Sequence, residues 1–152
     1  MLVPLVLVGM NIAYAASAYP LGVLSDRVGR TGLLAVGVVI LLLADMVLAA
    51  SSSLPAIAAG VVLWGLHLGF TQGILAAMVA ECAPPELRGT AFGMFNLITG
   101  LSLLVASLLA GALWEAFGPQ GTFLAGAGLA ALTLPALRLL TPPRKPPAEI
   151  RH

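Results

Sequence analysis

Three of the few charged residues in this sequence, Asp26, Arg27 and Arg30, stand close together near the N-terminus. A carboxylate beside guanidinium groups can form charge-assisted hydrogen bonds, either locally or with a neighbouring loop. A second pair of charges, Glu81 and Arg88, is separated by six residues further along the chain. Each of these two groups contains both an acidic and a basic residue. They therefore suggest ion pairing between the two segments.

No arrangement typical of an enzyme accompanies these charges. The sequence has no nucleophile with a matching base, no phosphate-binding loop, and no Cys/His cluster with metal-ligand spacing. The single cysteine, Cys82, cannot form an internal disulfide and is interpreted as a free thiol. We therefore predict no enzymatic activity, no metal and no cofactor.

The composition places these charges in a membrane protein. Hydrophobic residues make up 60% of the chain and charged residues only 9%, whereas soluble domains contain about 25% charged residues. So few charges cannot cover a water-facing surface. The net charge of +1 is too small to indicate a nucleic-acid partner.

Five apolar segments are long enough to cross a bilayer, which requires about 20 residues each. Because backbone groups in hydrocarbon must satisfy one another, all five are predicted to be helices. The sequence thus predicts an all-α integral membrane bundle over residues 1–140, with a disordered cytoplasmic tail at 141–152. The expected spans are residues 1–20, 32–50, 55–81, 89–114 and 121–140.

The distribution of basic residues predicts the orientation. With five crossings, all 7 Lys and Arg residues fall on one side of the membrane, which is the cytoplasmic side by the positive-inside rule. The chain then begins outside the cell, within an apolar segment. A signal peptide would need a basic n-region that is missing here, so we expect Met1 to lie inside a longer protein. The basic residues are Arg27, Arg30, Arg88, Arg138, Arg144, Lys145 and Arg151.

The segment GVLSDRVGRTGLL, residues 22–34, resembles the signature loop of the major facilitator superfamily, G-x-L-[AS]-D-R-x-G-R-[RK]. Thr31 departs from the final basic position of that motif. The resemblance implies a cytoplasmic loop between the second and third helices of a six-helix bundle. The matching residues are Gly22, Leu24, Ser25, Asp26, Arg27, Gly29 and Arg30.

The segment ECAPPELRGTAFG is similar to a Glu-x6-Arg element of sugar porters in the same superfamily, with Glu81 and Arg88 at its two charged positions. The whole chain resembles helices 8 to 12 of a twelve-helix transporter. It would form the C-terminal bundle without that bundle's first helix. The missing partners would be helix 7 and the N-terminal six-helix bundle.

The resemblance implies a secondary transporter in a bacterial cytoplasmic membrane, moving a small solute by alternating access. Its two cytoplasmic loops would form a gate from Gly22, Asp26, Arg27, Gly29, Arg30, Glu81 and Arg88. The alternative for these charges is that they only orient the protein. The alternative for the chain is a five-span scaffold or subunit that transports nothing without a partner chain. The solute, the direction and the coupling ion, for which a proton is one candidate, stay open.

Small residues repeat on the third span, where Gly65, Gly69 and Gly73 form one stripe that favours close helix packing. In a scaffold, this stripe would be the partner surface. His67 and Thr71 lie on roughly the opposite side. They are therefore candidates to line a solute pathway, although His67 could instead donate to a backbone carbonyl and Thr71 to its own helix.

A second intramembrane ionisable residue, Asp45, lies at a depth similar to that of His67. Both stand roughly 20 Å from the cytoplasmic edge at 1.5 Å per residue. The two side chains could pair if their helices touch. Alternatively, Asp45 reaches the outer interface.

Neutral polar residues mark two further helix faces. Asn11 and Tyr14 are one turn apart on the first span, and Asn96 and Thr99 share a face of the fourth. In the superfamily the corresponding helices border the cavity. All four residues are therefore candidates for solute contact, with interhelical hydrogen bonding as the alternative.

Overall fold

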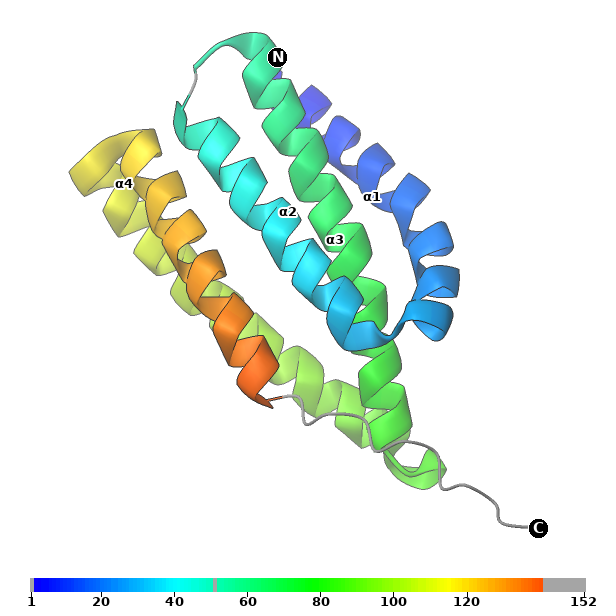
Figure 1. Cartoon of the computed structure of the whole chain (residues 1–152). Coiled ribbons are helices and arrows are strands. Elements are labelled where there is room, and N and C mark those ends of the chain that lie inside the picture. The colour runs from blue at the N-terminus through cyan, green and yellow to red at the C-terminus, as the bar shows by residue number, and fades with distance from the viewer. Residues whose placement is uncertain (1, 51, 141–152) are drawn as a thin grey trace.

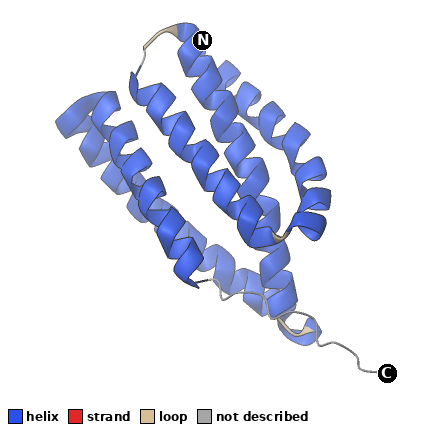
Figure 2. Cartoon of the chain, in the orientation of Figure 1, coloured by secondary structure: helices blue, strands red, loops and turns tan. Residues whose placement is uncertain are grey.

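A computed structural model describes residues 2–50 and 52–140, apart from the side chains of residues 2–3, 26–28, 138 and 140. The described chain is helical with short connections (Figure 2). Its four long helices are α1 (Leu2–Val28), α2 (Arg30–Ala50), α3 (Leu54–Cys82) and α4 (Arg88–Leu140), with a 3-10 turn, η1 (Pro85–Leu87), before α4. Each long helix is apolar enough to cross a membrane. The predicted all-α membrane fold is confirmed, whereas the predicted tail at 141–152 lies outside the described residues.

The first helix is longer than the sequence indicated. The expected span covers residues 1–20, whereas α1 continues to Val28 with Pro20 inside it. Proline fixes φ near the helical value and removes only one backbone hydrogen bond, so a helix with other support can continue through it. Most of the expected signature loop is therefore the last part of α1. The connection to α2 is reduced to Gly29, whose φ of +100° explains the glycine.

The fourth helix folds back on itself. Its 53 residues contain a non-helical backbone conformation at Gly118, with φ 69° and ψ −173°. Figure 1 shows two antiparallel arms, here called the outgoing arm (residues 88–117) and the returning arm (residues 119–140). Across the bend, the rings of Trp114 and Phe123 make an edge-to-face contact with centroids 6.4 Å apart. The structure therefore has four long helices in its described residues where five were expected.

Helix α3 lies between α1 and α2, and α2 in turn packs against α4 (Figure 1). The core cluster joins α2 to α3 through Leu33, Leu34 and Ile74. Leu137 of the returning arm covers that cluster, so this arm runs antiparallel to α2. No described residue of the outgoing arm is buried. The bundle is therefore open along that arm.

Candidate functional site

An ion pair joins two helix ends that are far apart in the sequence. Nη1 of Arg30, the first residue of α2, donates to Oε2 of Glu81 near the end of α3. The Arg30 side chain is 21% exposed and that of Glu81 is 66% exposed. An ion pair open to solvent contributes only about 0–1 kcal/mol. It can therefore hold two helix ends in register and still break readily.

The other residues of the predicted gate lie on α1, in the turn before α2 and at the start of α4. Gly22 lies within α1 with open space beside it, and Gly29 forms the turn into α2. Asp26 and Arg27 belong to the last turn of α1, but their side chains lie outside the described part. Arg88 begins α4 and is exposed, without an ion pair to any described residue. Of the predicted charges with described side chains, the structure thus brings together Arg30 and Glu81.

Two glycines of the predicted stripe lie against α1. A Cβ on Gly65 would meet the carbonyl of Met10, and one on Gly69 would meet the hydroxyl of Ser17. Only residues without a side chain allow two backbones to approach this closely. Gly73 differs from both, because open space surrounds its Cβ position. The α1–α3 contact therefore uses two of the three predicted positions.

His67 and Thr71 lie at the contact between α3 and α2. Nδ1 of His67 is 2.8 Å from the carbonyl oxygen of Gly37, and the Thr71 hydroxyl donates to the carbonyl of His67 at 2.9 Å. A Cβ on Gly37 would stand 2.9 Å from both Phe70 and Thr71. This is the bonding pattern of the alternative interpretation, in which both residues satisfy backbone groups. Neither side chain is fully buried.

The remaining pathway candidates occupy more open positions. The Asn11 side chain donates to the carbonyl of Leu7 at 2.8 Å and is exposed, whereas Tyr14 is half-buried. Asn96 and Thr99 are exposed on the outgoing arm and form no hydrogen bond between their side chains and other described residues. Polar groups are costly against hydrocarbon. These two residues are better suited to face water or another protein segment than lipid.

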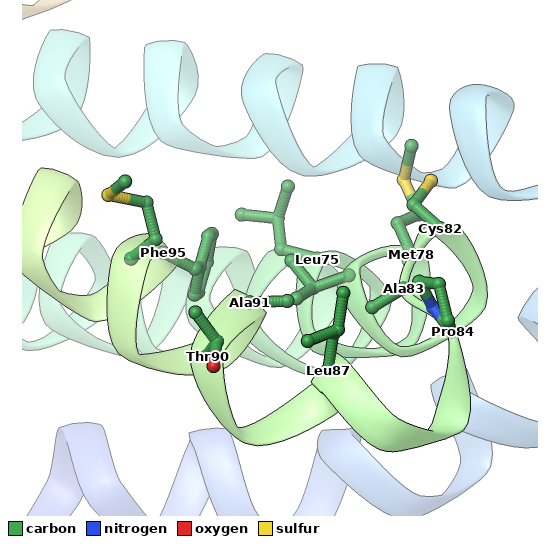
Figure 3. A pocket seen from close by; sticks show the side chains of 11 residues that line it. Leu75, Met78, Cys82, Ala83, Pro84, Leu87, Thr90, Ala91 and Phe95 are labelled. Carbon is green, nitrogen blue, oxygen red and sulfur yellow. The ribbon is translucent and has the colours of Figure 1, made fainter.

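The sequence did not predict a groove of about 600 Å³ where α3 ends and α4 begins. Figure 3 shows side chains of both helices surrounding it. Ligand pockets in proteins commonly have volumes of about 300–1,000 Å³ and mostly apolar walls. The only sequence signal is the run of small and apolar residues on either side of Pro84-Pro85. The groove is lined by Leu75, Met78, Val79, Cys82, Ala83, Pro84, Leu87, Thr90, Ala91, Met94 and Phe95.

Asp45 is buried at the contact between α2 and the returning arm, with 6% of its surface exposed. A Cβ on Gly126 would stand 2.8 Å from its Oδ2 atom. Asp45 and His67 form no ion pair with each other, because each faces a different glycine on a different helix. The described residues contain no group of three or more His, Cys, Asp or Glu side chains placed to hold a metal ion.

Comparisons with known proteins agree on one family. The profile of the Major Facilitator Superfamily matches residues 2–152. An MFS-type transporter of Methanocaldococcus jannaschii is 34% identical over 81% of this chain, which corresponds to 31% of the relative. The multidrug efflux pump Tap of Mycobacterium tuberculosis is 37% identical over 78% of the chain and 30% of the pump. The glucose transporter GlcP of Staphylococcus epidermidis is 28% identical over 69% of the chain and 24% of that transporter. The chain thus spans less than a third of the length of these relatives.

Proposed function

The chain belongs to the Major Facilitator Superfamily, and we propose that it forms part of a secondary active transporter that moves a small solute by alternating access. The family and the relatives support a membrane transporter and not an enzyme. The observation that carries the proposed mechanism is the ion pair between Arg30 and Glu81. It connects the residues of two separate motifs at one end of the bundle.

We infer that the chain crosses the membrane five times. At 1.5 Å per residue, the 53 residues of α4 would extend about 80 Å if straight, far beyond a hydrocarbon core of about 30 Å. The bend at Gly118 divides α4 into two arms that can each span a bilayer. The ends that carry Arg30 and Arg88 then face the cytoplasm of a bacterial cell, together with the C-terminus.

The complete transporter would include segments that the chain does not contain. The chain covers only 24–31% of the three relatives described above, and the outgoing arm has no buried described residue. An apolar helix and a second bundle, corresponding to helix 7 and the N-terminal half, would cover that open side. Asn96 and Thr99 on this arm would then face the solute pathway between the bundles.

In the proposed mechanism, the Arg30–Glu81 pair holds α2 and α3 together while the cytoplasmic side is closed. Opening towards the cytoplasm breaks the pair, and water then solvates both charges. Because an exposed pair is worth only about 0–1 kcal/mol, the transition between the two states would have a small energetic cost at this point. Arg88 is exposed and follows Glu81 closely in the sequence. In the second state it would form an ion pair with Glu81 in place of Arg30.

The gate is tested by charge reversal in the product of the native gene. Arg30→Glu and Glu81→Arg are compared singly and together, with Glu86→Arg as a matched control, because Glu86 is also an acid of this connection but forms no described ion pair. Ethidium efflux and glucose uptake serve as probes, since the relatives include a multidrug pump and a glucose transporter. Each single reversal should lower the transport rate several-fold, and the double reversal should restore much of it. Equal rates in all variants at equal abundance would contradict the gate.

The length of the native protein is tested separately by tagging the C-terminus at His152 in the native genome. A band in the membrane fraction at two or more times 15.5 kDa would support a complete transporter. A band near 15.5 kDa would contradict it and would instead support a five-span subunit that requires a partner chain.

A further inference from the structure

Asp45 is a buried acid that neither the proposed gate nor the proposed pathway uses. It lies on α2 against the returning arm of α4, two elements that run side by side in Figure 1. Its carboxyl group occupies the space that a side chain at position 126 would otherwise fill, since a Cβ on Gly126 would stand 2.8 Å from Oδ2. The absence of a side chain at Gly126 therefore leaves room for the carboxyl group of Asp45.

No basic group of the described chain neutralises this carboxyl. Asp45 forms no hydrogen bond or ion pair with a described residue. On α2 the first basic residue is Arg30, fifteen residues away, or about 22 Å along the helix. On α3, His67 is bonded to Gly37, which lies eight residues from Asp45 and thus about 12 Å along α2.

The returning arm offers no counter-charge near Asp45 either. Its titratable residue in the sequence, Arg138, follows Gly126 by twelve positions towards the opposite end, or about 18 Å. On the outgoing arm, Glu115 is an exposed acid and would add negative charge. These four titratable groups are therefore distant from Asp45, already bonded or of the same sign.

A bare carboxylate inside a membrane is costly, so such groups pair with a cation or carry a proton. Ca²⁺ takes about six to eight oxygen ligands, many of them from the protein, whereas Mg²⁺ takes about six and keeps several of them as water. The described residues contain no group of three or more His, Cys, Asp or Glu side chains placed to hold a metal ion, and the carboxyl faces a glycine on α4. A proton needs only one carboxyl oxygen. The surroundings of Asp45 therefore suit a proton and not a metal ion.

We propose that Asp45 is a proton-binding site. With α2 packed against Gly126, one carboxyl oxygen forms an O–H bond with a proton taken from water, and the group becomes neutral. When the helices separate and water enters, that O–H bond breaks and the proton returns to water. The described chain has no side-chain oxygen that is both fully enclosed and without a hydrogen-bond partner. The carboxyl oxygens of Asp45, which have no described hydrogen-bond partner, therefore keep a small accessible surface.

The proposed role of this proton rests on the proposed transport function. Binding of a proton favours close packing of α2 on the returning arm, and its release favours separation. The same helix, α2, carries Arg30 at its other end. Protonation at Asp45 would therefore bias the position of the helix that also holds the gate, which is how a proton gradient could drive the solute.

The site is tested by infrared spectroscopy of the chain reconstituted in phospholipid bilayers at neutral pH, without any solute. We expect the C=O stretching band of a protonated carboxyl group, and we expect Asp45→Asn to abolish it. Glu115→Gln, which removes an exposed acid before the bend, should leave the band unchanged. Absence of the band in the unmodified chain, or its persistence in Asp45→Asn, would overturn the proposal. Loss of the band on adding Na⁺ would also overturn it in favour of a metal ion.

A second variant keeps the test decisive if Asp45→Asn fails to fold. Gly126→Ala places a methyl group within 2.8 Å of Oδ2 and leaves the carboxyl present. We expect this variant to shift the frequency of the band, and an unchanged frequency would show that the band comes from elsewhere. Because none of these measurements involves a solute, proton binding can fail while transport holds, or the reverse.

Discussion

Nδ1 of His67 on α3 lies 2.8 Å from the carbonyl oxygen of Gly37 on α2. A carbonyl oxygen only accepts hydrogen bonds, so Nδ1 must carry the hydrogen atom and donate it. The contact is possible because Gly37 has no side chain, since a Cβ there would stand 2.9 Å from Phe70 and from Thr71. A histidine that the sequence suggested for a solute pathway thus links two helices.

Replacing His67 by alanine removes this interhelical hydrogen bond. Such bonds in membranes contribute about 0.6 kcal/mol on average and up to about 1.7, so we expect His67→Ala to lower the free energy of unfolding by about 1 kcal/mol. Unfolding in mixed detergent micelles measures the change. Asn11→Ala is the control, because Asn11 donates only within its own helix. Equal stability of the His67 variant and the unmodified chain would contradict the contact.

Two glycines of one stripe should respond in opposite ways to a methyl group. Gly69→Ala introduces a Cβ against the hydroxyl of Ser17, and overpacking of this kind costs about 1–3 kcal/mol. Gly73→Ala introduces the same group into open space, where alanine gains up to about 1 kcal/mol of helix propensity. Thermal unfolding of the purified variants in detergent measures both changes. A loss of stability in Gly73→Ala as large as in Gly69→Ala would contradict the described α1–α3 contact.

The turn between α1 and α2 depends on backbone conformation instead of space. Gly29 has φ of +100°, and a side chain in the left-handed region costs about 1–2 kcal/mol. We therefore expect Gly29→Ala to lower the free energy of unfolding by that amount, although no atom lies within 4 Å of its Cβ position. Gly32→Ala is a matched control, because Gly32 is also surrounded by open space and lies in α2 with no positive φ.

The membrane explains what the sequence predicts well. Hydrocarbon forces apolar segments to be helical, so long apolar runs locate the helices. The all-α membrane fold and the family follow from these runs and from the signature at Gly22–Leu34. Helix ends were less predictable. Pro20 normally indicates a boundary, but one missing backbone bond did not end α1.

The contacts between helices could not be predicted in the same way. The stripe of Gly65 and Gly69 is visible in the sequence, but the sequence does not say which helix approaches it. The contacts of His67 with Gly37 and of Asp45 with Gly126 depend on the rotation of two helices about their axes. Gly37 and Gly126 do not belong to a repeated stripe of small residues, so the sequence does not indicate which side chains they contact. His67 and Asp45 could be recognised as unusual, but their surroundings could not.

The groove between α3 and α4 can be tested through a thiol that the chain already contains. Cys82 is the single cysteine, is exposed and lines the groove together with Ala91. A tryptophan at position 91 should fill much of the 600 Å³ space and cover the thiol. We therefore expect Ala91→Trp to slow the reaction of Cys82 with a maleimide several-fold in reconstituted protein. Ala112→Trp, on an exposed part of the outgoing arm outside the groove, should leave the reaction rate unchanged. Equal rates in both variants would show that Cys82 does not line a groove with Ala91, because a shared wall is what would couple the two positions.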